Sequence, residues 1–226
     1  MNQKITVSCA CTKVLASVNL SEQRKPTRLK CYCIDCQTYA QHLNAAESQL
    51  DANGGTDILQ LSPATLSIQY GKELLGNLNL KPDGIYRWYS TCCNTPLFNT
   101  PSKVDMPYLG LLTTNITKVS QTARPAKSKS QNTKIERENR ENVLNECLGP
   151  VNYGVCAGKQ YPMSTDWPVA KGFGMRGILG TLRNMARWRL RGDHKKSILI
   201  DAETGKPLVP PTVISLEERQ AAKSKI

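Results

Sequence analysis

The chain has 226 residues, of which 39% are hydrophobic and 6% aromatic, enough for one large domain or for one domain with an extension. No apolar run approaches the roughly 18 residues of a membrane-spanning helix. The N-terminus lacks a secretory signal or a transit peptide, so we expect a cytoplasmic protein. The net charge is +12, and residues 121–226 carry most of it, with 19 basic and 10 acidic side chains. That half of the chain therefore provides most of the attraction for anions.

Short β-strands are predicted throughout the first half of the chain. β-Branched and apolar residues alternate in these segments, and turn residues such as Asn77 and Pro82-Asp83-Gly84 separate them. The predicted strands cover residues 4–8, 13–20, 27–30, 57–60, 65–70 and 84–89, and a helix is predicted over 35–43. Residues 1–118 are thus expected to form a mainly β domain.

The second half has a different composition. Residues 119–134 are rich in Lys, Ser, Gln and Ala around Pro125 and are predicted to be a flexible basic connector. Residues 135–226 are predicted to be a helical basic extension, giving an α+β protein overall. Its expected elements are helices over 136–147, 175–191 and 216–225, and a short hairpin from 197–200 and 207–209.

The helix predicted over 175–191 is basic and amphipathic. Met175, Leu179 and Leu182 recur at helical spacing, and arginines occupy much of the remaining surface. The pattern favours packing of the apolar stripe on the β domain, and it leaves open an acidic partner or a peripheral membrane contact. No nucleic-acid-binding motif accompanies the helix, so we do not expect nucleic acid as a partner.

The nine cysteines carry the strongest chemical signal. Because the reducing cytosol disfavours disulfides, clustered cysteines there more often bind metals or act in redox chemistry. Seven of them form three tight groups: Cys9 and Cys11; Cys31, Cys33 and Cys36; Cys92 and Cys93. Cys147 and Cys156 stand apart and are predicted to be small buried apolar side chains rather than ligands.

The middle group places three thiols within six residues, so that Cys31, Cys33 and Cys36 can ligate one zinc ion. Three protein ligands leave a fourth position open, which distinguishes catalytic from structural zinc. A redox dithiol and inert buried cysteines are the alternatives. His42, shortly after Cys36, is a further candidate for the fourth ligand.

The outer groups can share a second ion. Cys9, Cys11 and Cys93 are its predicted ligands. Whether Cys92 is also a ligand is left undecided, because successive residues of a strand point to opposite faces. The sequence therefore predicts one or two zinc ions.

Three stretches in this order resemble the glutathione-dependent formaldehyde-activating enzyme (centromere protein V-like) family. They are Ser8-Cys9-Ala10-Cys11, Cys31-Tyr32-Cys33-Ile34-Asp35-Cys36-Gln37 and, after Trp88-Tyr89, Cys93-Asn94-Thr95-Pro96-Leu97-Phe98. The resemblance implies a β-tent zinc fold with a closed site from the first and last groups. It also implies an open catalytic zinc at Cys31, Cys33 and Cys36. Ser90 stands where the family has a cysteine, so either Cys92 supplies the fourth thiolate or the closed site is altered.

The activity implied by the resemblance is that of a carbon–sulfur lyase, which joins a small thiol such as glutathione to an aldehyde such as formaldehyde. The alternative is a non-catalytic zinc-stabilised module whose basic C-terminal half contacts an acidic partner or a membrane surface. The altered last cysteine group and the long extension favour this alternative.

Overall fold

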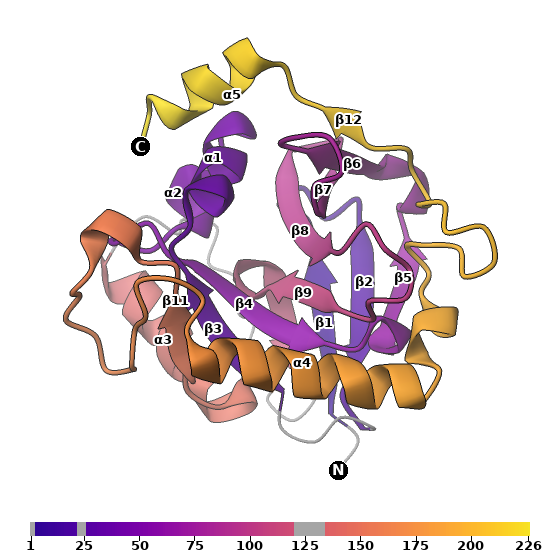
Figure 1. Cartoon of the computed structure of the whole chain (residues 1–226), viewed down its shortest axis with the longest axis horizontal. Helices are drawn as coiled ribbons and strands as arrows, with labels where there is room; N and C mark the ends of the chain where they lie inside the picture. Colours follow the sequence, from indigo (N-terminus) through magenta and orange to yellow (C-terminus); the bar gives the residue numbers. More distant parts are fainter. Residues whose placement is uncertain (1–2, 22–25, 120–133) are drawn as a thin grey trace.

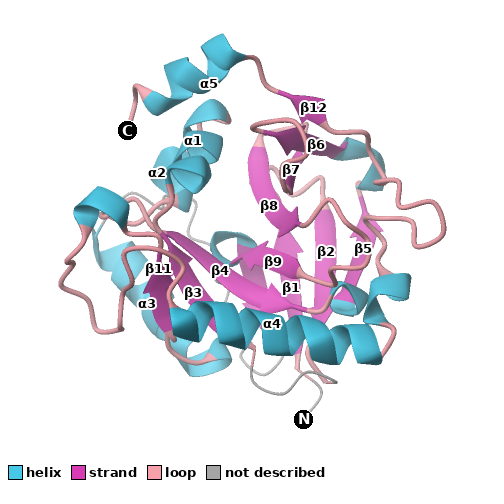
Figure 2. Ribbon diagram, viewed as in Figure 1, coloured by secondary structure: helices cyan, strands magenta, loops and turns pink. Residues whose placement is uncertain are grey.

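The computed structural model describes residues 3–21, 26–119 and 134–226, which form a mainly β molecule with two sheets and five α-helices (Figure 2). The strands are β1 (Lys4–Ser8), β2 (Leu15–Asn19), β3 (Thr27–Cys31), β4 (Thr56–Leu61), β5 (Leu66–Tyr70), β6 (Leu75–Asn79), β7 (Tyr86–Ser90), β8 (Thr95–Thr100), β9 (Leu109–Leu112), β10 (Ile116–Val119), β11 (Tyr153–Val155) and β12 (Thr212–Val213). The α-helices are α1 (Ile34–His42), α2 (Ala46–Gln49), α3 (Lys134–Leu148), α4 (Met175–Leu190) and α5 (Leu216–Lys223). Short 3-10 helices lie at η1 (Pro63–Thr65), η2 (Lys72–Leu74), η3 (Thr113–Asn115), η4 (Gly158–Gln160) and η5 (Asp193–Lys196).

The smaller sheet is antiparallel, with the strand order β10-β1-β2-β5. In strand β1, buried and exposed residues alternate at its start as the sequence predicts: Lys4 is exposed, and Ile5 and Val7 are buried. Ile5 lies opposite Val18 of β2, which is also buried. The apolar face of this sheet therefore covers one side of the main core.

The larger sheet has the order β11-β3-β4-β9-β8-β7-β6-β12. Its two edge strands, β11 and β12, come from the C-terminal part of the chain and run parallel to their neighbours (Figure 1). Trp88 and Leu111 of this sheet join Ile5 and Val18 in the main core, and the Trp88 indole donates a hydrogen bond of 3.0 Å to the Thr100 hydroxyl. Residues beyond 134 thus complete both edges of the sheet.

A buried ion-pair network joins α3 to the larger sheet. The fully buried Arg28 donates from Nε to Asp57 Oδ1 at 3.0 Å and from Nη2 to Glu141 Oε1 at 3.0 Å. Lys30 lies 3.3 Å from Glu141 Oε2, and Arg28 also donates to Asn145 Oδ1 at 2.7 Å. These contacts satisfy a guanidinium that would be costly to bury alone, and they fix α3 beside β3.

Most predicted elements of the first half are present. The strands expected at 4–8, 27–30 and 57–60 correspond to β1, β3 and β4, and the expected helix corresponds to α1. The turn expected at Asn77 is wrong: this residue is buried within β6, and its side-chain amide donates to Val209 O at 3.0 Å. Residues 120–133 of the predicted connector lie outside the described residues.

The C-terminal elements differ from their predictions in detail. The hairpin expected from 197–200 and 207–209 is reduced to one bridge between Ile200 and Pro207, flanked by a hydrogen bond from Leu208 N to Leu199 O. A proline cannot donate to a strand ladder, which limits the pairing. Among the described helices, none is long and apolar enough to cross a membrane.

Helix α4 packs through a face other than its apolar stripe. Met175, Leu179 and Leu182 are all more than half exposed, whereas Gly177 and Trp188 are buried. A Cβ atom added at Gly177 would lie 3.4 Å from side-chain atoms of Tyr153 and Val155, so α4 packs against β11 at this glycine. The interpretation that the stripe packs on the β domain is therefore wrong.

Candidate metal centres

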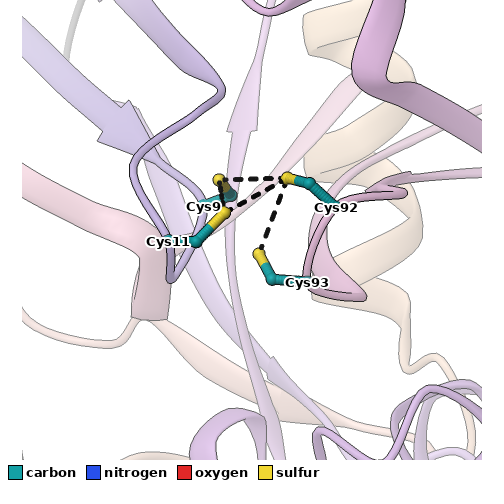
Figure 3. Close-up of side chains that lie close together, drawn as sticks. All are labelled: Cys9, Cys11, Cys92 and Cys93. Carbon is teal, nitrogen blue, oxygen red and sulfur yellow. Dashed lines mark hydrogen bonds between the residues drawn. The ribbon is translucent and has the colours of Figure 1, made fainter.

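The first candidate centre, here called the four-cysteine group, consists of Cys9, Cys11, Cys92 and Cys93. Cys9 and Cys11 lie in the turn between β1 and β2, while Cys92 and Cys93 lie in the turn between β7 and β8. Figure 3 shows the four sulfur atoms pointing toward one another, and all lie within 4.8 Å of each other. Because β1 and β7 belong to different sheets, an ion bound here would connect the two sheets.

The sulfur spacing suits a tetrahedral ion. Cys9 Sγ lies 3.5 Å from Cys11 Sγ and 3.9 Å from Cys92 Sγ, and Cys92 Sγ lies 3.2 Å from Cys11 Sγ and 3.9 Å from Cys93 Sγ. A tetrahedron with Zn–S bonds of 2.3 Å has sulfur atoms about 3.8 Å apart. Four thiols at such distances fit a closed structural site. The structure places Cys92 in this group together with the three predicted ligands.

The turn that carries Cys93 also places a hydroxyl group beside its sulfur. Ser90 Oγ lies 3.2 Å from Cys93 Sγ, and it accepts a hydrogen bond of 3.2 Å from Thr95 N. Asn94 adopts the left-handed conformation with φ 51°, which lets the chain reverse there. Burial opposes ionisation of Cys93, but hydrogen bonds with Ser90 and Thr95 lower its pKa to about 6.

The second candidate centre, here called the three-cysteine group, consists of Cys31, Cys33 and Cys36. Cys31 ends β3, Cys33 is the N-cap of α1, and Cys36 lies in its first turn. Cys33 Sγ accepts a hydrogen bond from Cys36 N at 3.3 Å, and Cys36 Sγ lies 3.7 Å from Cys31 Sγ. The three sulfur atoms are within 4.8 Å of one another. The loop between a strand and a helix therefore brings the predicted ligands together.

Arg87 supplies positive charge to the three-cysteine group. It is 3% exposed, its Nη1 lies 3.9 Å from Cys36 Sγ, and its guanidinium lies 5.1 Å from the centre of the Tyr39 ring. Within the described residues, its ion pairs include no carboxylate, and the negative charge acting on it comes from Cys36 and Cys33. A buried guanidinium requires a counter-charge, so this environment suits thiolates or a thiolate-bound ion.

The thiols of this group differ in acidity. Hydrogen bonds with Cys31 and Cys33 lower the pKa of Cys36 well below its usual value, and the charge of Arg87 acts in the same direction. The hydrogen bond with Cys31 lowers the pKa of Cys33, but the hydrogen bond with Cys36 and burial outweigh it and raise that pKa to about 12. Of the three thiols, Cys36 is therefore the one whose surroundings lower its pKa and favour the thiolate.

A cavity of about 500 Å³ opens beside the three-cysteine group. Its wall includes the three thiols, Arg87 and Asn99, and the Asn99 Oδ1 atom is buried without a hydrogen-bond partner in the described residues. Most of the remaining lining is apolar, with Leu29, Ile58, Ile85, Met106, Val155, Phe173 and Met185. The cavity can therefore admit a small ligand to the thiols.

Two residues of this site were not found from the sequence. Arg87 precedes the buried Trp88 in β7. A charged residue next to tryptophan and tyrosine in a predicted strand is the signal that could have identified it. Cys156 follows β11 and lines the same cavity, and its side-chain hydrogen bond is the largest influence that raises the pKa of Cys31. The prediction that Cys156 is only a small buried side chain missed this position. Its neighbour in that prediction, Cys147, is partly buried against the main core.

His42 is not part of either centre. It is the last residue of α1, and neither candidate group of the described residues includes a histidine. Its charge instead acts on Glu218 of α5. The interpretation of His42 as a ligand is therefore not supported.

Comparison with known proteins places the chain in a family. Residues 1–134 match the family of unknown function DUF6151, and this stretch holds the seven cysteines of both groups but not Cys147 or Cys156. No curated protein matches the chain. Because the match covers more than half of its residues, the chain belongs to the DUF6151 family.

Proposed function

We propose that the protein binds two zinc ions, a structural ion at the four-cysteine group and a reactive ion at the three-cysteine group. The observation that carries the proposal is the position of Cys31, Cys33 and Cys36 at the wall of a cavity of about 500 Å³. Three protein thiolates leave one position for a ligand from solution, as in catalytic zinc sites.

The proposed reaction adds a small thiol to an aldehyde, the chemistry of the formaldehyde-activating enzymes that the sequence resembles. A bond forms between the thiol sulfur and the carbonyl carbon, the carbon–oxygen π bond breaks, and the thiol proton ends on the oxygen. The product is a hydroxyalkyl thioether, and no oxidant or reductant is consumed. A bound zinc ion would lower the pKa of the thiol, so that it reacts as a thiolate. The motif order and the meeting of two sheets at the four-cysteine group support the β-tent fold.

The protein's own residues would position and balance the reacting thiolate. Arg87 places a buried positive charge beside Cys36, which offsets the excess negative charge of three thiolates around a divalent ion. Asn99 adds a polar side chain to the cavity wall. The apolar lining excludes water from the thiolate and strengthens these interactions.

The lining also bears on the substrate class. Among the residues that line the cavity, only Asp35, Lys81 and Arg87 are charged. Glutathione carries three charged groups, and Arg87 is already engaged with Cys36. The cavity therefore favours a thiol with a neutral, apolar body over glutathione.

Titration of the cobalt-loaded protein with thiols tests this function. We expect benzyl mercaptan to change the cobalt spectrum at lower concentration than glutathione does. Cys36→Ser should abolish the response, and Cys147→Ser should preserve it because Cys147 belongs to neither group. A spectrum that no thiol perturbs would refute the reactive site.

A second candidate function, peripheral binding to an anionic membrane, is favoured by the outward stripe of α4. Met175, Leu179, Leu182 and Leu190 are exposed along one side of the helix. Arg176, Arg183 and Arg187 are exposed beside them, and α4 contains no acidic residue. If a second copy of the chain packed on α4 through the same face, the arginines of the two helices would repel each other. An anionic bilayer can instead contact both the apolar stripe and the arginines.

Co-sedimentation with vesicles tests the membrane contact. We expect the protein to bind vesicles containing phosphatidylglycerol, more weakly as salt increases, and not vesicles of phosphatidylcholine alone. The double variant Leu179→Glu, Leu182→Glu should lose binding. Leu216→Glu is the control, because Leu216 is an exposed leucine outside α4, on α5. Equal sedimentation of both variants would contradict a role for α4.

A further inference from the structure

The C-terminal part of the chain delivers a fourth cysteine to the three-cysteine group. β11 runs parallel to β3, with Val155 opposite Cys31 and with Tyr32 N donating to Val155 O at 3.0 Å. Cys156 is the next residue, so this pairing sets it at the end of β3 where Cys31 lies. No other described cysteine outside the three-cysteine group lines the cavity.

The side chain of Cys156 already contacts the group. It packs against the apolar cluster that contains Cys31, Cys36 and Val155, and it lines the same cavity as the three thiols. The three thiols of the group lie within 4.8 Å of one another, and Cys156 is not within that distance of all of them. It is therefore adjacent to the site, and its side chain must move closer to share an ion with all three.

The backbone holds Cys156 in an unusual conformation. Its φ is 59°, in the left-handed region that a residue with a side chain seldom adopts outside Asn and Asp. Cys156 N donates to Gly172 O at 2.6 Å, and the next amide, Ala157 N, donates to Ala170 O at 3.1 Å. These bonds fix the turn, so that the position of the thiol depends on the fold of residues 153–172.

We propose that Cys156 is the fourth ligand of the ion at the three-cysteine group, and that a thiol entering the cavity replaces it. Zinc in proteins has four ligands when no substrate or water fills the last position. The proposal rests on the proposed function for its second part, the replacement by a thiol, and it adds a residue from outside the family-matched region.

Charge makes this fourth ligand exchangeable. Three thiolates and a divalent ion carry one net negative charge, which Arg87 balances. The thiolate of Cys156 adds a negative charge, and among the described residues that line the cavity there is no buried cation besides Arg87 to balance it, which lowers its affinity for the site. In the exchange, the entering thiol gives its proton to Cys156, which leaves as a neutral thiol. The net charge of the site does not change.

Cobalt loading of full-length variants tests the ligand. Two four-thiolate centres hold eight thiolates in total. Removing one of them in Cys156→Ser should therefore lower the thiolate-to-cobalt absorbance by about one eighth. The affinity of one of the two ions should fall by about 10–100-fold. Cys147→Ser should match the wild type. An unchanged spectrum and affinity in Cys156→Ser would overturn the proposal.

A measurement on the wild type covers the case that the variant does not fold. Zinc should protect Cys156 from alkylation, and adding benzyl mercaptan should restore its reactivity while Cys31, Cys33 and Cys36 stay protected. Equal alkylation of Cys156 with and without zinc would overturn its role as a ligand. Protection by zinc that no thiol reverses would show a permanent ligand, refuting both the exchange and the proposed reactive site. A thiol-dependent spectrum without protection of Cys156 would refute this inference and preserve the proposed function.

Discussion

The guanidinium of Arg87 lies 3.9 Å from the sulfur of Cys36, and both side chains are buried beneath the cavity. Cys31, at the end of β3, and Cys36, in the first turn of α1, have their sulfur atoms 3.7 Å apart. Strand β7 thus supplies the positive charge, while β3 and the start of α1 supply the thiols. The negative charge of the three-cysteine group is therefore balanced by a residue about fifty positions away in the sequence from Cys36.

Replacing Arg87 by methionine should weaken one metal centre only. Methionine keeps the apolar volume but removes the charge that stabilises the thiolates, so we expect about a 10–100-fold loss of zinc affinity at one of two ions. Competition with a chromophoric chelator measures both affinities. Arg189→Met, a change at an exposed arginine of α4, is the control. Equal affinities in the Arg87 variant and the wild type would show that the guanidinium does not act on the centre.

Removing the ion of the four-cysteine group should loosen the contact between the two sheets. Cys9 and Cys11 belong to the smaller sheet's hairpin and Cys92 follows a strand of the larger sheet, so the ion acts as a cross-link. We expect Cys92→Ser to lower the midpoint of thermal unfolding, and to bind one zinc ion fewer than Cys147→Ser. A chelator should lower the wild-type midpoint as well. Unchanged midpoints in both experiments would exclude a cross-link.

The network around Arg28 should contribute strongly to stability. Asp57→Asn removes the main counter-charge of a fully buried guanidinium, and breaking such a pair costs about 3–5 kcal/mol. Urea unfolding monitored by tryptophan fluorescence measures the change. Glu146→Gln, on the exposed side of α3, should stay within about 0.5 kcal/mol of the wild type. A loss as small as that of the control would contradict the account of α3 packing.

The cap of α5 should respond to acid. Ser215 accepts from Glu218 N at 3.1 Å and donates its own backbone N–H to Glu218 Oε2 at 2.8 Å, and these hydrogen bonds hold the pKa of Glu218 below its usual value. A carboxylate with a depressed pKa stabilises the fold above its unfolded pKa of about 4.3, and that contribution is lost as the pH falls through the folded pKa. Protection against hydrogen exchange over residues 216–223, taken relative to the intrinsic exchange rate at each pH, should therefore decrease below pH 4. Ser215→Ala should show the same decrease at pH 7, and unchanged protection there would contradict the capping box.

The local parts of the site were predictable from the sequence. Cys31, Cys33 and Cys36 lie in one short segment, and Cys9 and Cys11 lie in one turn, so their spacing alone predicts that these thiols meet. Spacing did not decide the position of Cys92, because it is adjacent to Cys93 in the sequence. Spacing cannot show which turns meet, because that depends on how the smaller sheet packs on the larger one.

The long-range parts of the site were not predictable in the same way. Arg87 reaches Cys36 only through the position of β7 in the sheet, and Cys156 reaches Cys31 only because β11 pairs with β3 across more than a hundred residues. The orientation of α4 was missed for a similar reason. A hydrophobic stripe defines two faces of a helix, but its sequence does not show that the face with the buried Gly177 and Trp188 is the one that packs.

The number of zinc ions per chain, measured by native mass spectrometry on the protein purified without added metal, tests the central claim most directly. Two zinc ions should be bound by the wild type, one by Cys36→Ser and one by Cys92→Ser, with two retained by Cys147→Ser. A wild-type protein that binds no zinc, or one whose zinc count does not change in Cys36→Ser or Cys92→Ser, would contradict the account of two thiolate metal centres.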